Sequence, residues 1–145
     1  MLKKHTFWLK AAIILQLLTA GLHSLSFLNN PLPENESEKQ LMDLMNTYKK
    51  DLGGGFDPSM NDILISLSAC LPLLCILGGW INLYLLKKKA DENILKGVVG
   101  INVIVFGACF ILMAIFTFLP PIICTGLIFI FLLLSWLTFP KQKPV

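Results

Sequence analysis

The sequence predicts an all-α integral membrane protein, a four-transmembrane-helix bundle with an extracytoplasmic amphipathic helix between the first and second spans. The composition is 55% hydrophobic and only 14% charged, against roughly 25% charged residues in soluble domains. Four apolar runs approach the ~20 residues needed to cross about 30 Å of hydrocarbon. Each run is continuously apolar rather than alternating, which favours helices over a barrel. With 145 residues, the chain is one domain in size.

Spans are expected at residues 7–28, 63–86, 97–119 and 122–139, with a polar segment at 29–62. The first run has an alternative interpretation as a signal peptide, with lysines at its start and Leu18-Thr19-Ala20 before a cleavage point. The apolar core of a signal peptide is usually about 7–15 residues long. Because the apolar character here continues through Leu28, a transmembrane helix is favoured.

The lysines predict the orientation, and the sequence contains no arginine. Most of the 12 lysines flank the spans on one side, and only Lys39, Lys49 and Lys50 lie in the polar segment. The positive-inside rule therefore predicts that both termini are cytoplasmic and that residues 29–62 are extracytoplasmic. The net charge of +3 follows from this topology and gives no reason to expect nucleic acid as a partner.

Gln16, Thr19 and His23 recur at helical spacing in the first span, so they share a face. Polar side chains in hydrocarbon turn toward neighbouring helices, where they can hydrogen-bond. His23 is also a candidate proton acceptor or ligand, because it is ionisable and lies within the membrane. Since no second histidine and no acid lies near it within the spans, an interhelical packing role is favoured. His5 is expected to be an ordinary terminal residue.

The polar segment predicts an amphipathic helix over Ser37 to Leu52. Asn35 and Glu38 have the positions of an approximate capping box, and apolar residues recur three and four apart along one edge. This edge is expected to cover the top of the bundle, and Tyr48 on it is a candidate contact for a ligand or partner. The three glycines at 53–55 fit a helix stop rather than a phosphate loop, because neither GKS nor a preceding strand is present.

Two carboxylates, Asp57 and Asp62, precede the second span. Ser59 and Asp62 have the spacing of a helix-capping pair. The alternative is that the carboxylates act as an acid, a base or cation ligands beside His23. Helix starts commonly collect such residues, so capping is favoured for Ser59 and Asp62.

Small and polar residues form an expected packing seam along the second span, where Pro72 is expected to kink the helix and free backbone carbonyls. Asn102 lies at a depth in the third span that matches Asn82 in the second, which predicts a hydrogen bond or a shared polar layer. The packing seam of the second span consists of Ser68, Pro72, Cys75, Gly79 and Asn82.

A second close contact is predicted on the opposite side of the third span, at Gly97, Gly100, Gly107 and Ala114. Pro120-Pro121 is expected to form a tight turn before the fourth span. That span contains few polar residues, chiefly Thr125 and Ser135, and is expected to face mostly lipid.

The four cysteines are expected to pack as small hydrophobic residues. None forms a CxxC pair and all lie within apolar runs, out of reach of a partner's disulfide. The histidines and cysteines also lack the spacing of a metal site, so no metal and no cofactor is predicted. The four cysteines are Cys70, Cys75, Cys109 and Cys124.

Several segments together resemble a family of small uncharacterised bacterial four-span membrane proteins. They are GLHSLSF, LMDLMNTYKKDLGGG, GWINLYL, INVIVF and FTFLPPI, which are distributed over nearly the whole chain. The resemblance implies the four-span architecture. It implies no reaction.

The leading functional hypothesis is a noncatalytic protein of the bacterial cytoplasmic membrane that binds a lipid-like molecule or a membrane partner through its outer cap, residues 29–62. The alternative is a membrane enzyme that acts on an amphiphilic substrate with His23 and a loop carboxylate. Transport is less favoured, because the fourth span offers almost no polar path. A homodimer remains open, since four short helices enclose little volume. Candidate contacts of the cap are His23, Tyr48, Asp57 and Asp62, and candidate interhelical polar contacts are Gln16, Ser68, Asn82 and Asn102.

Overall fold

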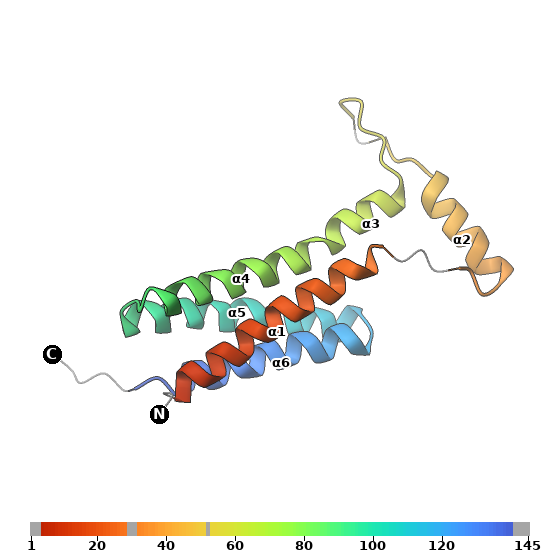
Figure 1. The fold of residues 1–145 in the computed structure, drawn as a ribbon. Helices are drawn as coiled ribbons and strands as arrows, with labels where there is room; N and C mark the ends of the chain where they lie inside the picture. Colours follow the sequence, from red (N-terminus) through yellow and green to blue (C-terminus); the bar gives the residue numbers. More distant parts are fainter. Residues whose placement is uncertain (1–3, 29–31, 52, 141–145) are drawn as a thin grey trace. The chain divides into compact units, whose positions relative to one another are not determined.

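The computed structural model describes residues 4–28, 32–51 and 53–140, and within these ranges it contains helices and no named strand. Four stretches are long and apolar enough to cross a membrane, namely Lys4–Ser26, Met60–Lys87, Glu92–Phe116 and Leu119–Leu137. The prediction of an all-α fold with four membrane-spanning candidates is confirmed (Figure 1). The helices are α1 (Lys4–Ser26), α2 (Glu36–Thr47), α3 (Met60–Ser68), α4 (Cys70–Lys87), α5 (Glu92–Phe116) and α6 (Leu119–Leu137).

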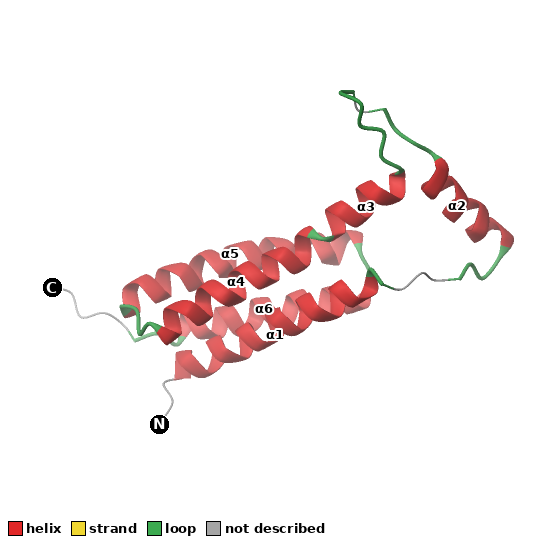
Figure 2. Cartoon of the chain, turned by 45° about the horizontal axis from the view of Figure 1, so that its top comes forward, coloured by secondary structure: helices red, strands yellow, loops and turns green. Residues whose placement is uncertain are grey.

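The chain forms two compact units. The first contains the described residues up to Ala20 and from Cys75 onward, which include all of α5 and α6 and most of α1 and α4. Within this unit the four helices run alongside one another (Figure 2). Their buried apolar side chains form its core, which includes Leu9, Ala12, Val99, Phe106, Ile128 and Leu132. The second unit, residues 21–74, contains the end of α1, all of α2 and α3, and the first turn of α4.

Helix α6 buries five of its 19 residues in the core of the first unit, and the rest stay exposed or partly exposed. The expectation that it is a mostly lipid-facing packing helix stays a prediction. Thr125, Ile128 and Leu132 are fully buried, and the Ser135 hydroxyl donates to the His5 carbonyl at 3.0 Å. His5 is itself buried, and its ring stacks on Phe139 with centroids 4.3 Å apart. His5 is therefore part of the packing rather than an ordinary terminal residue.

Glycines on α5 and α6 pack against aromatic rings of the facing helix. A Cβ placed on Gly107 would lie 3.0 Å from the Phe129 ring, and one on Gly126 would lie 3.0 Å from the Phe110 ring. The two rings stack on each other, with centroids 6.3 Å apart and planes at 6°. Gly100 approaches Trp136 in the same way, so the predicted close contact exists at Gly100 and Gly107. Gly97 faces open space and Ala114 is exposed, so they take no part.

Two helix starts differ from the sequence-based bounds because of local capping. Helix α5 begins at Glu92 rather than near residue 97, since Asp91 caps it by accepting a hydrogen bond from the Asn93 backbone nitrogen at 2.8 Å. Pro120 and Pro121 lie inside the first turn of α6 and do not form the turn before it. Proline is tolerated there, because the first N–H groups of a helix have no intrahelical partner.

The connection from α2 to α3 is a short hairpin rather than a longer helix. Helix α2 ends at Thr47, because the next residues pair with the start of α3: Lys50 N donates to the Pro58 carbonyl and Met60 N to the Tyr48 carbonyl. The tip contains Gly53, Gly54 and Gly55 at φ of 78°, 65° and 83°, a left-handed backbone that glycine adopts without steric cost. The predicted end at Leu52 falls on a residue outside the described ranges.

Candidate functional site

His23, in the last turn of α1, is held by Ser68 at the end of α3. Its Nε2 atom lies 3.0 Å from the Ser68 hydroxyl and 3.3 Å from the Ser68 carbonyl oxygen. The ring also meets Phe27 edge-on, with centroids 5.3 Å apart. The polar contact expected at Ser68 therefore has His23 as its partner, which agrees with the favoured packing role of that histidine.

Pro72 explains why the Ser68 carbonyl can accept a hydrogen bond from outside its own helix. In a continuous helix this carbonyl would accept from the backbone nitrogen of residue 72, four positions later. Proline has no N–H, so that bond cannot form. The chain changes from α3 to α4 at Ala69, beside the freed carbonyl. With the hydrogen on Nε2, His23 can donate to this carbonyl or to the hydroxyl, and an unsatisfied backbone group within the membrane is avoided.

We expect Ser68→Ala to lower the stability of the protein in detergent by about 0.6–2 kcal/mol, the range for interhelical hydrogen bonds in membranes. Ser66→Ala is the matched control, since Ser66 lies in the same helix and is exposed. Unfolding should be followed by circular dichroism. Equal midpoints for the two variants would contradict the contact between His23 and the Ser68 hydroxyl.

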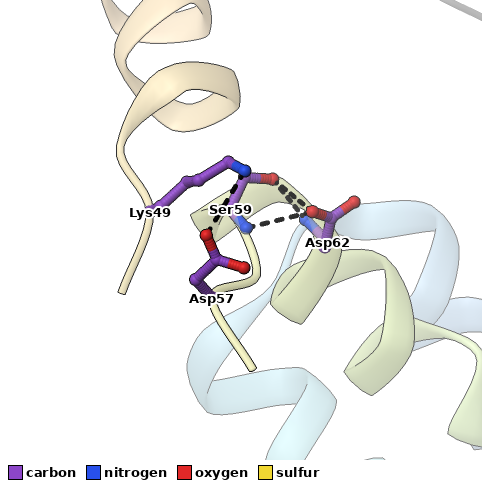
Figure 3. Close-up of polar contacts among 4 residues, drawn as sticks. All are labelled: Lys49, Asp57, Ser59 and Asp62. Carbon is purple, nitrogen blue, oxygen red and sulfur yellow. Dashed lines mark hydrogen bonds and ion pairs between the residues drawn. The ribbon is translucent and has the colours of Figure 1, made fainter. Parts of the chain in front are cut away.

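Asp62 serves as a helix cap, as favoured from the sequence. Its carboxylate accepts hydrogen bonds from the backbone nitrogen of Ser59 at 3.0 Å and from the Ser59 hydroxyl at 2.7 Å (Figure 3). In return, the Asp62 backbone nitrogen donates to the Ser59 hydroxyl oxygen at 3.1 Å. This reciprocal capping box starts α3 and uses both residues structurally.

Asp57 pairs with Lys49 across the hairpin, with 3.4 Å between the lysine Nζ atom and a carboxylate oxygen (Figure 3). The side chains are 63% and 65% exposed, so solvent screens the pair and it adds little stability. Tyr48 caps the end of α2 through its backbone, and its side chain is exposed. Tyr48 and Asp57 thus present polar groups to solvent around a defined hairpin.

His23 and the two carboxylates have different partners. The ring is held by Ser68, whereas Asp62 is held by Ser59 and Asp57 by Lys49. In the described part of the chain no hydrogen bond or ion pair joins His23 to either acid. Ser68 follows Asp62 by six residues, which is about 9 Å along a helix. An acid–base pair that needs direct contact is therefore not assembled by these contacts.

The apolar edge of α2 is accessible. None of its residues is buried, and the side chains of Leu41 and Leu44 are 55% and 59% exposed. The N-cap forms as expected, with the Asn35 side chain accepting from the Glu38 backbone nitrogen at 2.9 Å. The Glu38 carboxylate accepts from the Glu34 nitrogen at 2.6 Å. A capped helix therefore presents leucines to its surroundings.

The buried amides of the first unit meet around Gly78. A Cβ at Gly78 would lie 2.7 Å from Asn102 Oδ1 and 2.9 Å from Gln16 Nε2. The Asn102 side-chain nitrogen donates to the Val98 carbonyl at 3.0 Å. The expected Asn82–Asn102 hydrogen bond does not form, since both polar atoms of Asn82 lack a hydrogen-bond partner in the described structure.

The early start of α5 explains this error. Asn102 lies about 15 Å along α5 from Glu92, whereas Asn82 lies only about 7.5 Å along α4 before Lys87. Asn102 therefore reaches the level of Gly78, about one turn beyond Asn82. The sequence pattern did not single out Gly78. The pair of adjacent glycines at 78 and 79 was the available signal, because only a residue without a side chain lets two amides approach the backbone.

The four cysteines differ in their exposure to solvent. All four are free; Cys75 is buried, Cys109 and Cys124 are partly exposed, and Cys70 is exposed. Within the described residues no group of three or more His, Cys, Asp or Glu side chains could hold a metal ion. The cysteine positions thus fit the apolar packing expected for them.

No protein family, no curated protein and no solved structure matches this chain. The resemblance to small bacterial four-span proteins stays a prediction.

Proposed function

We propose that this is a noncatalytic integral membrane protein that binds a lipid-like molecule through its outer cap, residues 29–62. The proposal includes the topology expected from the lysines, with both termini on the cytoplasmic side of a bacterial membrane and the cap outside. Four apolar helices of membrane-spanning length support an integral membrane location.

The exposed apolar edge of α2 is the observation that carries the proposal. Within its own unit, residues 21–74, α2 buries none of its residues, and Leu41 and Leu44 are more than half exposed. Phe56, at the hairpin tip, is 74% exposed. Apolar side chains on a capped amphipathic helix in a chain with membrane spans suit an acyl chain or the interface between headgroups and hydrocarbon.

The charge of the cap restricts the lipid class. Residues 32–62 contain seven acidic side chains and three lysines. Such a surface repels anionic headgroups at low ionic strength and tolerates zwitterionic or cationic ones. A zwitterionic amphiphile is therefore the favoured ligand, recognised mainly through its apolar part.

The alternative, a membrane enzyme that uses His23 with Asp57 or Asp62, gains no support from the contacts. Its proposed base is hydrogen-bonded to Ser68, and its proposed acids are used in a cap and in an exposed ion pair. A membrane-protein partner for the cap is retained as an outcome of the following experiment.

Photocrosslinking should locate the ligand. A photoreactive phenylalanine analogue at Leu44 is expected to give lipid adducts in zwitterionic vesicles, read as mass shifts of the intact protein. The control is the same analogue at Asn46, which is exposed on the opposite face of α2. In cell membranes, a high-mass adduct confined to position 44 would identify a protein partner instead. Equal labelling at both positions, or none at either, would contradict binding through this edge.

A further inference from the structure

We propose that the four-helix unit holds water at a buried site between Gln16 and Asn82, beside Gly78. Both amide side chains are fully buried. Neither the nitrogen nor the oxygen of either amide has a hydrogen-bond partner among the described residues. Buried polar groups are nearly always hydrogen-bonded to protein or to ordered water. Two amides without any protein partner in one bundle therefore indicate a bound molecule that forms hydrogen bonds with both.

The Gln16 head group and Asn82 lie about one helical turn apart along α4. Gln16 Nε2 would lie 2.9 Å from a Cβ on Gly78, so the Gln16 head group is beside the backbone of that residue. Asn82 follows Gly78 by four positions and shares its face of α4, about 6 Å further along the helix. Two hydrogen bonds of about 2.9 Å each span a similar distance. One water molecule can therefore bond to both head groups, which form no hydrogen bond with each other.

The chemistry of the side chains selects water over a cation. Each amide has two N–H donors as well as an acceptor oxygen. A cation would use the oxygens and leave the four donors unsatisfied, whereas water accepts and donates. The amides carry no charge. The fully buried ring of Phe106 lies next to Gly78, on one side of the proposed water site. Burying a neutral molecule in such apolar surroundings costs far less free energy than burying an ion.

The side-chain hydroxyl of Thr19 offers a hydrogen-bonding group for a further water molecule at the next turn of α1. Its hydroxyl is buried without a hydrogen-bond partner in the described part of the chain, and it lies on the same face as Gln16. By contrast, Asn102 beside Gly78 already donates to the Val98 carbonyl. The unpartnered groups thus follow the α1–α4 side of the bundle.

Water-edited solid-state NMR in zwitterionic bilayers tests the site directly. Protein with 15N-labelled asparagine, glutamine and isoleucine should show fast magnetisation transfer from water to the side-chain amides of Gln16 and Asn82, comparable with that to exposed Asn93. Signals are assigned by their loss in Gln16→Leu and Asn82→Leu. Transfer as slow as that to the backbone amide of Ile104, an exposed position midway along α5 in the bilayer, would overturn the proposal.

Two further measurements distinguish a shared water molecule from a bound cation and from two separately hydrated amides. Gln16→Leu should slow transfer to Asn82 severalfold, because the bridging water loses one partner; unchanged transfer to Asn82 would show that no guest is shared and would overturn the bridge. Exchange of sodium for choline should leave both amide shifts unchanged. Amide shifts that depend on the sodium concentration would identify a cation as the guest and would also overturn the proposal. All three outcomes are independent of lipid binding by the cap.

Discussion

Gly78→Leu is expected to lower the free energy of unfolding by about 1–3 kcal/mol, the usual effect of overpacking a well-filled core. Even the first carbon of the new side chain would lie 2.7 Å from Asn102 Oδ1, 2.9 Å from Gln16 Nε2 and 3.2 Å from Phe106 Cε2. The two amides and the ring would have to move together. Because they belong to α1 and α5, both helices would be displaced from α4.

Gly97→Leu is the matched control for this prediction. It also places a leucine at a helical glycine, but a Cβ there has no neighbour within 4 Å. Both variants gain the higher helix propensity of leucine over glycine, so the difference between them reports packing alone. Thermal unfolding in detergent, with the elution profile as a check on folding, gives the comparison. A Gly78→Leu protein as stable as Gly97→Leu would show that the amides do not pack against Gly78.

Gly107→Leu is expected to separate α5 from α6 at a similar cost of about 1–3 kcal/mol. The added Cβ would lie 3.0 Å from Cε2 and 3.3 Å from Cδ2 of Phe129, and the ring cannot retreat freely because it stacks on Phe110. Ala108→Leu is the control, since Ala108 is the adjacent residue and is exposed.

A double-mutant cycle distinguishes this contact from a general loss of stability. Phe129→Ala removes the ring that the new leucine would strike, so the combined variant should lose less stability than the two single changes added together. Strict additivity would contradict a direct contact between residues 107 and 129. Unfolding midpoints in one detergent for all four proteins supply the cycle.

The apolar runs and helix caps explain which parts of the fold were predictable. Continuous hydrophobicity located four spans, and the short-range pairs Asn35–Glu38 and Ser59–Asp62 form as expected. The depth of Asn102 was misjudged because the start of a helix depends on its cap, Asp91, whereas hydropathy follows only the apolar residues. An error of a few residues moves a side chain by a full turn.

The arrangement of the candidate site depended on contacts that sequence spacing does not encode. Pro72 predicted a freed carbonyl, but only the folded chain shows that His23 reaches Ser68 instead of a carboxylate. The partner of Gly107 was not identifiable for a related reason. A close contact was expected there, but the facing Phe129 is one apolar residue among many in the fourth run.

The break at Ala69 has a consequence for the choice of host membrane. Helix α4 has 18 residues and is about 27 Å long, close to the thickness of the hydrocarbon layer. The whole stretch Met60–Lys87 has 28 residues and would extend about 42 Å as one rod. We therefore expect the protein to tolerate bilayers of different thickness, since a longer or a shorter part of this stretch can lie within the hydrocarbon layer.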